Sequence, residues 1–338
     1  MFTRLQSLAS MLGRIPPSSY LEKPRPMQNK SIAANIAVPR VHVPLVVIAV
    51  VALVAALAIT VPSDREWWKV VVLGVVQGVT EWLPISSTGH LLIVADLLAY
   101  EGSIGGTFEI FIQLGTVLSV VAFYFGDLLA QGRALLGRGT RDEAAAARRL
   151  WLGVAIAIVP AGLIGVFFRE FIKTVLFGSP HVIAGALIFG GVIFLIIERL
   201  PRREARATEL GQITPLQALG VGVAQIFALI PGMSRSGSSI VGGLLAGLDR
   251  RTATAFSFYL SIPILGAATL TDLVGSLDMI QRDDWGRLLL GAVVAMIVGY
   301  VTIGWLLRYI ARNTFVPFGI YRIVVGLLIL ALAGMGIL

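Results

Sequence analysis

The sequence contains no cysteine and only three histidines, His42, His90 and His181, which lie far apart in the chain. The lack of cysteine excludes disulfide bonds and thiolate metal sites, and so few scattered histidines argue against a histidine-rich metal cage. Charged residues are scarce as well, because they make up 14% of the chain against about 25% in an average soluble domain. A chain this poor in charge cannot present a polar surface to water on every side.

Apolar residues dominate instead, at 57% of the 338 residues, and they fall in runs of about 20. Because these runs are continuous rather than alternating, they favour bilayer-crossing helices over barrel strands. The sequence therefore predicts an all-α polytopic membrane protein. We expect helices at 67–83, 107–126, 150–169, 181–198, 214–230, 252–274, 287–307 and 317–337, and shorter, re-entrant helices at 87–99 and 236–248.

The N-terminal part differs in composition from the rest. Residues 1–42 carry scattered prolines and basic residues, and we expect a disordered tail. Residues 43–62 form an apolar run long enough to span a bilayer. We interpret it as an extra transmembrane helix rather than a signal peptide, because it has no clear small-residue cleavage site. The main membrane domain is then 67–338.

Basic residues are unevenly distributed between the predicted loops. If both short helices return to the face from which they enter, most of the 27 Lys and Arg residues fall on one face, which the positive-inside rule makes cytoplasmic. The C-terminus then lies outside, and the net charge of +8 requires no nucleic acid partner. The hairpin at 67–99 enters from outside and the hairpin at 214–248 from the cytoplasm, so the two are opposed.

The two opposed hairpins also resemble each other in sequence. The segments "QGVTEWLPISSTG" (77–89) and "QIFALIPGMSRSG" (225–237) each place a Gln, an apolar stretch and a Pro before a Ser-x-Ser/Thr-Gly group. This similarity predicts an inverted-topology repeat with halves at about 67–200 and 214–338. Such repeats usually build one site where their broken helices meet.

The second break carries the residue types that a phosphate group requires. Arg235 supplies a planar, permanently charged donor fork, in a membrane setting where a charge is costly and marks function. Half-helix N-termini bind anions as well. The predicted phosphate-binding residues around Arg235 are Ser234, Ser236, Gly237 and Ser239.

The first break supplies groups for acid–base or metal chemistry. Glu81 needs a partner in or near the membrane: it can pair with Arg235, ligate a divalent cation together with Gln77, or act as a base. Gln77 lies one helical turn before Glu81, so both line one face of the helix. The weaker candidates, which we expect to support the site, are Glu109, Gln113 and Arg322.

Hydroxyl groups follow the first break and lead to a histidine. Ser87 and His90 are spaced so that they could form a nucleophile and its base, and His90 can carry a proton near neutral pH. Ser86 and Thr88 offer further hydroxyls for phosphate binding. The residues leave the nucleophile open between Ser87, His90 and water.

Four segments resemble the bacterial undecaprenyl-diphosphate phosphatase family, of the bacitracin-resistance type: "QGVTEWLPISSTGHLLIV", "TFEIFIQLG", "PGMSRSGSSI" and "FVPFGIYR". They occur in the family's order between Trp67 and the C-terminus. The resemblance implies a hydrolase of the bacterial cytoplasmic membrane that converts undecaprenyl diphosphate to the monophosphate, recycling the lipid carrier of cell-wall synthesis at a site open to the outer face. It implies a divalent cation, Ca²⁺ or Mg²⁺, and catalytic roles for Glu81, Ser87, His90 and Arg235.

The sequence departs from the family pattern at two places. Gln77 stands where the family often has Glu, and an amide cannot act as a base and is a weaker metal ligand. Residues 1–66 have no counterpart in the family. The oligomeric state, monomer or homodimer, stays open.

Two other functions would use the same features. A polyprenyl-phosphate flippase would share the inverted repeat and the anion site, but it would release no inorganic phosphate. A type-2 phosphatidic acid phosphatase would need a second His shortly after Arg235, where this chain has Val241, and we set that function aside.

Overall fold

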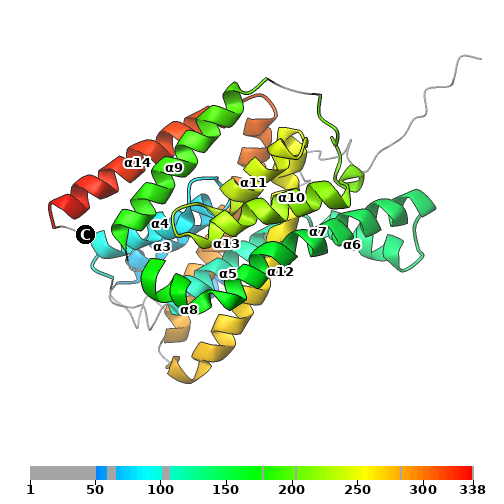
Figure 1. The fold of residues 1–338 in the computed structure, drawn as a ribbon. Helices are drawn as coiled ribbons and strands as arrows, with labels where there is room; N and C mark the ends of the chain where they lie inside the picture. Colours follow the sequence, from blue (N-terminus) through cyan, green and yellow to red (C-terminus); the bar gives the residue numbers. More distant parts are fainter. Residues whose placement is uncertain are drawn as a thin grey trace, which may run out of the picture. The chain divides into compact units, whose positions relative to one another are not determined.

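The computed structural model describes residues 51–58, 66–100, 107–176, 179–201, 204–281 and 284–336. Regular structure in these ranges is helical (Figure 1), which confirms the all-α prediction. Five described helices are long and apolar enough to cross a membrane, and a bent pair would make a sixth. The five are α7 (Arg141–Phe167), α9 (Pro180–Arg199), α12 (Arg250–Ser276), α13 (Asp284–Ile310) and α14 (Val316–Gly334), and the bent pair is α5 (Thr107–Phe123) with α6 (Phe125–Leu135).

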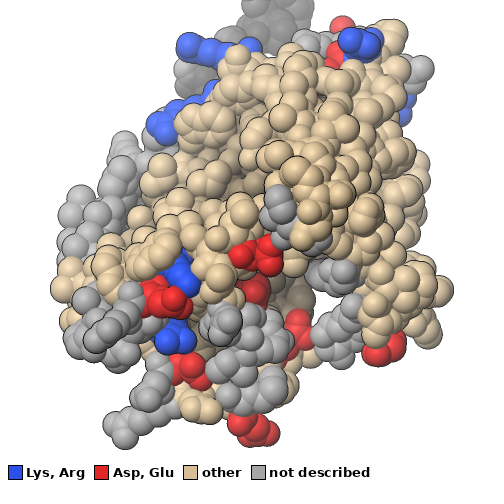
Figure 2. Space-filling model, turned by 90° about the vertical axis from the view of Figure 1, so that its left-hand side faces the viewer, with Lys and Arg blue, Asp and Glu red and all other residues tan. Residues whose placement is uncertain are grey.

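The surface agrees with a membrane environment. Figure 2 shows one face with a broad band free of charged residues; Lys and Arg gather toward its upper end, and Asp and Glu lie mainly toward its lower end. Large apolar side chains such as Phe167 and Leu216, each about four-fifths exposed, face outward. Such exposure is expected where lipid replaces water as the solvent.

One expected loop is helical instead. The expected helices at 107–126 and 150–169 leave 127–149 as a loop between them, but α6 covers its beginning and α7 already starts at Arg141. A capping box starts α7: Thr140 Oγ1 accepts from Glu143 N at 3.2 Å, and Thr140 N donates to Glu143 Oε2 at 2.8 Å. This Thr-x-x-Glu signal outweighs the polar composition that favoured a loop.

Two short helices stand at the two predicted breaks. α4 (Ser87–Leu97) follows α3 (Trp67–Thr80), and α11 (Arg235–Leu245) follows α10 (Pro215–Gln225) and the 3-10 turn η4 (Ile226–Leu229). α4 and α11 have 11 residues each, which at about 1.5 Å per residue is too short to span a bilayer. Their N-cap residues, Ser86 and Ser234, have φ of 75° and 71°. Positive φ is strained for a residue with a Cβ, so the chain turns sharply at these two serines.

Close helix contacts hold the two breaks in place. A Cβ on Gly74 of α3 would lie 2.9 Å from the carbonyl oxygen of Gly291 on α13, and a Cβ on Gly222 of α10 would lie 2.6 Å from that of Ala157 on α7. α9 and α14 run side by side in Figure 1. A Cβ on Gly191 of α9 would lie 2.6 Å from the carbonyl oxygen of Gly319 on α14. Only glycine allows backbones this near, so these contacts fix α3 and α10 against long helices.

The expected N-terminal helix at 43–62 lies only partly within the described residues. Residues 51–58 are helical, and Leu53, Ala56 and Leu57 pack against an apolar cluster that includes Val70 and Phe111. Its role as a transmembrane span stays a prediction, and the expected tail at 1–42 lies outside the described residues.

Candidate active site

The two breaks meet at a buried ion pair. Glu81 directly follows α3 and Arg235 is the first residue of α11, and Arg235 Nη2 lies 3.0 Å from Glu81 Oε1. Their side chains are only 5% and 12% exposed, respectively. Removing one member of a buried pair leaves an uncompensated charge, at a cost of about 3–5 kcal/mol. The pair therefore joins residues 154 apart in sequence and defines the centre of the site.

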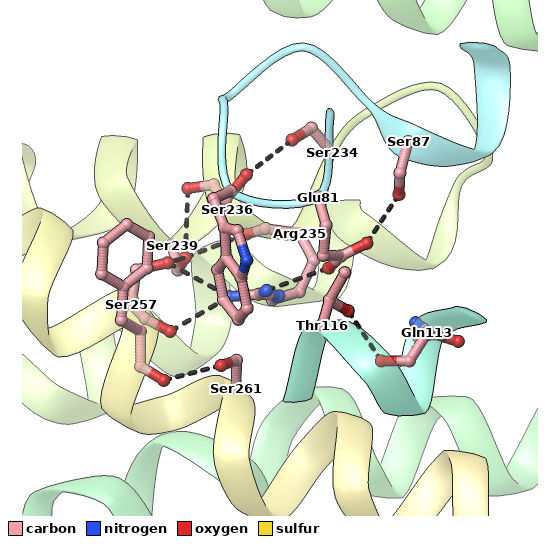
Figure 3. Close-up of polar contacts among 12 residues, drawn as sticks. Glu81, Ser87, Gln113, Thr116, Ser234, Arg235, Ser236, Ser239, Ser257 and Ser261 are labelled. Carbon is pink, nitrogen blue, oxygen red and sulfur yellow. Dashed lines mark hydrogen bonds and ion pairs between the residues drawn. The ribbon is translucent and has the colours of Figure 1, made fainter. Parts of the chain in front are cut away.

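The other oxygen of Glu81 faces the first break. Glu81 Oε2 accepts a hydrogen bond from Ser87 Oγ at 2.7 Å and another from Gln77 Nε2 at 3.2 Å. Figure 3 shows Ser87 entering from α4 and pointing at this carboxylate. A hydroxyl bonded to a carboxylate within this distance has the geometry of a nucleophile and its general base.

Arg235 is held by residues that sequence reasoning missed. Its Nη1 donates to the carbonyl oxygen of Ser257 at 3.0 Å and to Ser257 Oγ at 3.3 Å, and its Cζ lies 5.5 Å from the ring centre of Trp82. Its Nε is buried and makes no hydrogen bond to the described residues. A buried donor without a partner costs about 1–3 kcal/mol, so this N–H is available for an anionic ligand. The position of Trp82 next to Glu81 was the only sequence signal for this arrangement.

The predicted phosphate-binding serines of α11 bond mostly to the protein itself. Ser234 Oγ accepts from Gly237 N and contacts Ser236 Oγ, both at 3.1 Å. Ser236 Oγ also reaches the carbonyl oxygen of Leu83 at 3.1 Å, and Ser239 Oγ lies 2.7 Å from Ser257 Oγ. These hydroxyls cap α11 and join it to the first break and to α12, as Figure 3 shows for the serines.

The N-terminus of α4 is built differently. Its N-cap Ser86 makes no side-chain hydrogen bond to the first turn, in contrast to Ser234 at the start of α11. The first N–H groups of α4, which include those of Ser87 and Thr88, therefore lack a side-chain cap. Uncapped N–H groups at a helix N-terminus favour an anion, so this end of α4 suits a phosphate better than the start of α11 does.

His90 does not contact Ser87 as its spacing suggested. Its Nδ1 lies 2.7 Å from the carbonyl oxygen of Ser86, and its Nε2 lies 2.8 Å from the hydroxyl of Tyr321. A carbonyl only accepts, so Nδ1 carries the proton, and Nε2 of the neutral ring accepts from Tyr321. The two rings stack with centroids 5.6 Å apart. The pair of Ser87 with a base is therefore made by Glu81, and Tyr321 is a neighbour that the sequence did not indicate.

Arg322 ties the two breaks together from behind. The residue is 1% exposed, and its guanidinium donates only to backbone carbonyls in the described part of the chain, rather than to a carboxylate. Pro84 of the first break and Gly232 of the second accept at 3.1 and 3.0 Å. The carbonyl oxygens of Ala186 and Leu187 on α9 accept at 3.2 and 3.3 Å. Arg322 is thus a fixed support for both turns.

The remaining supporting candidates lie on α5. Glu109 and Gln113 are half-buried and one turn apart, and the carbonyl oxygen of Gln113 accepts from Thr116 Oγ1 at 2.7 Å. Figure 3 shows Thr116 close to Glu81, with Gln113 one turn before it on the same helix. The supporting role of Glu109 and Gln113 stays a prediction.

The donor set for a divalent cation is small. Within the described residues, no three His, Asp or Glu side chains gather in a group that could hold a metal ion. Next to the Glu81 carboxylate, however, Gln77 Oε1 is buried and without a hydrogen-bond partner. One carboxylate and one amide oxygen fit a Mg²⁺-type site that is completed by substrate phosphates and water, but not a Ca²⁺ cage of six to eight protein oxygens.

Comparison with known proteins identifies the family of the chain. Residues 70–328 match the family model described as "Bacitracin resistance protein BacA". The undecaprenyl-diphosphatase of Deinococcus radiodurans is 44% identical over 277 residues, which cover 81% of this chain and 97% of that protein. Undecaprenyl-diphosphatase 1 of Burkholderia lata is 46% identical over 265 residues, covering 78% of this chain and 94% of that protein. The helical residues 51–58 lie outside the matched region.

Proposed function

The chain belongs to the bacitracin resistance protein BacA family and is a multi-pass membrane undecaprenyl-diphosphatase. From this premise we propose that Glu81, Ser87 and Arg235 carry out the hydrolysis of the diphosphate. The observation that supports this assignment is the continuous contact from Ser87 Oγ through the Glu81 carboxylate to Arg235. The substrate is undecaprenyl diphosphate, and the products are the lipid monophosphate and inorganic phosphate.

Substrate binding exchanges the partners of Arg235. Among the described residues, only Glu81 Oε1 occupies the guanidinium edge that carries Nε and Nη2, through its contact with Nη2. A phosphate group matches this edge with two parallel hydrogen bonds. When the terminal phosphate takes the edge, the contact between Arg235 and Glu81 is replaced by contacts from Arg235 to the phosphate. Glu81 keeps its hydrogen bond from Ser87 Oγ and so faces the hydroxyl that must give up its proton.

Glu81 accepts and gives up a proton in each of the two chemical steps. Ser87 Oγ attacks the terminal phosphorus and passes its proton to Glu81, and the bridging P–O bond breaks. Its electron pair leaves with the lipid monophosphate, which takes up the proton. In the second step Glu81 accepts a proton from water, which attacks the phosphorylated Ser87. The proton returns to Ser87 Oγ as inorganic phosphate departs. In-line transfer of this kind needs mainly positioning and charge neutralisation.

His90 acts on this sequence by orienting the nucleophile. Its Nδ1–H holds the carbonyl of Ser86, the strained residue immediately before Ser87. Tyr321 fixes the ring from the other side. We assign His90 a positioning role at Ser87, with Tyr321 as its outer hydrogen-bond partner.

A divalent cation completes the proposed site. Glu81 and Gln77 Oε1 would hold it from the protein side, once the Gln77 amide turns its oxygen rather than Nε2 toward the carboxylate, together with oxygens of the diphosphate and water. When bound, the cation neutralises charge on the phosphates. Because the protein offers one carboxylate here, we expect the cation to bind mainly with the substrate, and we favour Mg²⁺ over Ca²⁺.

We further propose that the fold is an inverted repeat whose site opens to the outer face of the bacterial cytoplasmic membrane. Three pairs of features support the repeat. Ser86 and Ser234 both begin a short helix with positive φ. Gln77 and Gln225 both bury an amide oxygen without a partner. α3 packs on α13 as α10 packs on α7.

The experiment is phosphate release from undecaprenyl diphosphate by purified protein in detergent, with and without chelator. We expect cation-dependent release that is abolished by Ser87→Ala and by Glu81→Gln. Wild-type release by both variants would overturn the assigned roles. Lipid binding without any phosphate release would favour the flippase function instead. Addition of substrate to only one side of proteoliposomes tests the outward opening.

A further inference from the structure

Trp82 is a buried aromatic residue that contacts a charged group, the guanidinium of Arg235. Its side chain has no exposed surface and lies with its ring face toward the guanidinium of Arg235, 5.5 Å from Cζ to the ring centre. Arg235 Nη1 and Nη2 are held by Ser257 and Glu81, but those contacts only restrain two corners of the guanidinium. The ring beneath it determines the remaining freedom, which is the tilt of the guanidinium plane.

The ring of Trp82 is itself immobilised from several helices. Trp82 Nε1 donates to Ser119 Oγ on α5 at 3.1 Å, and Ser119 Oγ donates on to the carbonyl oxygen of Thr116 at 2.6 Å. Phe258 on α12 meets the ring edge-on, with centroids 5.2 Å apart and planes at 82°. On α13, a Cβ at Gly299 would come within 3.0 Å of Trp82 Nε1. The indole therefore has one orientation available.

This arrangement matters because Nε of Arg235 has no hydrogen-bond partner in the described part of the chain. This donor can bind the substrate only if the guanidinium plane directs it at the diphosphate. An aromatic face attracts the positive charge of a guanidinium placed over it, and the attraction is strongest where water is excluded. If the guanidinium plane of Arg235 could tilt freely, it would lose that conformational freedom when the substrate binds, and this entropy cost would weaken the affinity.

We propose that Trp82 is a positioning residue for the hydrolysis, and that its ring fixes the plane of the Arg235 guanidinium so that the Nε–H edge faces the diphosphate. This inference rests on the proposed role of Arg235 in binding phosphate. It assigns to Trp82 an effect on diphosphate affinity that acts only through Arg235.

The test is a double-mutant cycle on the dissociation constant for undecaprenyl diphosphate in detergent. Trp82→Leu removes the aromatic face, and we expect a roughly 10–30-fold weaker affinity. Trp82→Phe keeps a weaker face, and we expect it to recover part of that loss. In an Arg235→Ala background, Trp82→Leu should change the dissociation constant less than twofold, because the group it orients is gone.

A matched control separates orientation from packing. Phe256→Leu removes another fully buried aromatic side chain of α12, which faces Gly153 on α7, and we expect it to lower Tm while changing the affinity less than twofold. Equal losses of affinity for Trp82→Leu with and without Arg235 would overturn the inference, as would a loss for Phe256→Leu as large as that for Trp82→Leu. Either result is independent of whether Ser87→Ala and Glu81→Gln abolish turnover, so the two proposals can fail separately.

Discussion

Replacing Arg322 by lysine should destabilise the protein without changing how it binds substrate. The guanidinium donates to four carbonyl oxygens on three segments, at 3.0–3.3 Å. A lysine keeps the charge, but its compact ammonium cannot span carbonyls on both breaks and on α9. If two of the four bonds are lost, at about 1.5–3 kcal/mol each for a charged donor, the free energy of unfolding falls by about 3 kcal/mol or more.

The assay combines thermal unfolding in detergent with phosphate-release kinetics at 25 °C. A loss of about 3 kcal/mol corresponds to a fall in Tm of roughly 6–12 °C for a chain of a few hundred residues. KM should stay within about twofold, since Arg322 bonds to the turns rather than to the ion pair. The control is Arg308→Lys, at an exposed position near the end of α13, which should leave Tm nearly unchanged. An unchanged Tm with a tenfold higher KM would show that Arg322 contacts substrate and would refute the reasoning.

Four further predictions concern the two breaks and α3. Glu81→Gln should lower kcat for phosphate release by at least about 100-fold, the usual contribution of a general base, and a wild-type kcat would contradict that role. Mass spectrometry of acid-quenched wild-type enzyme should find phosphate on Ser87, and its absence throughout turnover would favour water as nucleophile. Ser234→Ala removes the cap of α11 and should cost about 1 kcal/mol, seen as a lower Tm; a higher KM at constant Tm would make Ser234 a phosphate ligand instead. Gly78→Ala places a Cβ 2.8 Å from that of Val298, and thermal unfolding should show a loss of about 1–3 kcal/mol; a wild-type Tm would contradict the close packing of α3 on α13.

The sequence was most informative where a residue type is costly in its surroundings or breaks a helix. Arg235 and Glu81 could be paired from sequence because two charges in apolar surroundings need each other, and they are indeed in contact. The short helices α4 and α11 followed from Pro-containing polar breaks at the expected places. Helix ends were less certain, since α3 already ends at Thr80 and α6 was not expected.

What could not be predicted depends on side-chain directions across the fold. Ser87 and His90 lie three apart, and that spacing suggested a catalytic pair. The backbone turn at Ser86 instead presents its carbonyl to His90 and leaves Ser87 to Glu81. Tyr321 meets His90 across 231 residues of sequence, and no local pattern encodes such a contact.

The close contact between Arg322 and α9 has a consequence for how this protein can diverge. A Cβ on Gly190 would overlap the guanidinium of Arg322, so no other residue fits at 190 while the arginine keeps its place. The two positions, 132 apart in sequence, should therefore be inherited together. A lineage that loses the arginine is freed to enlarge residue 190, whereas the reverse order of substitutions passes through an intermediate that cannot pack. Substitution at this pair can therefore begin only at position 322.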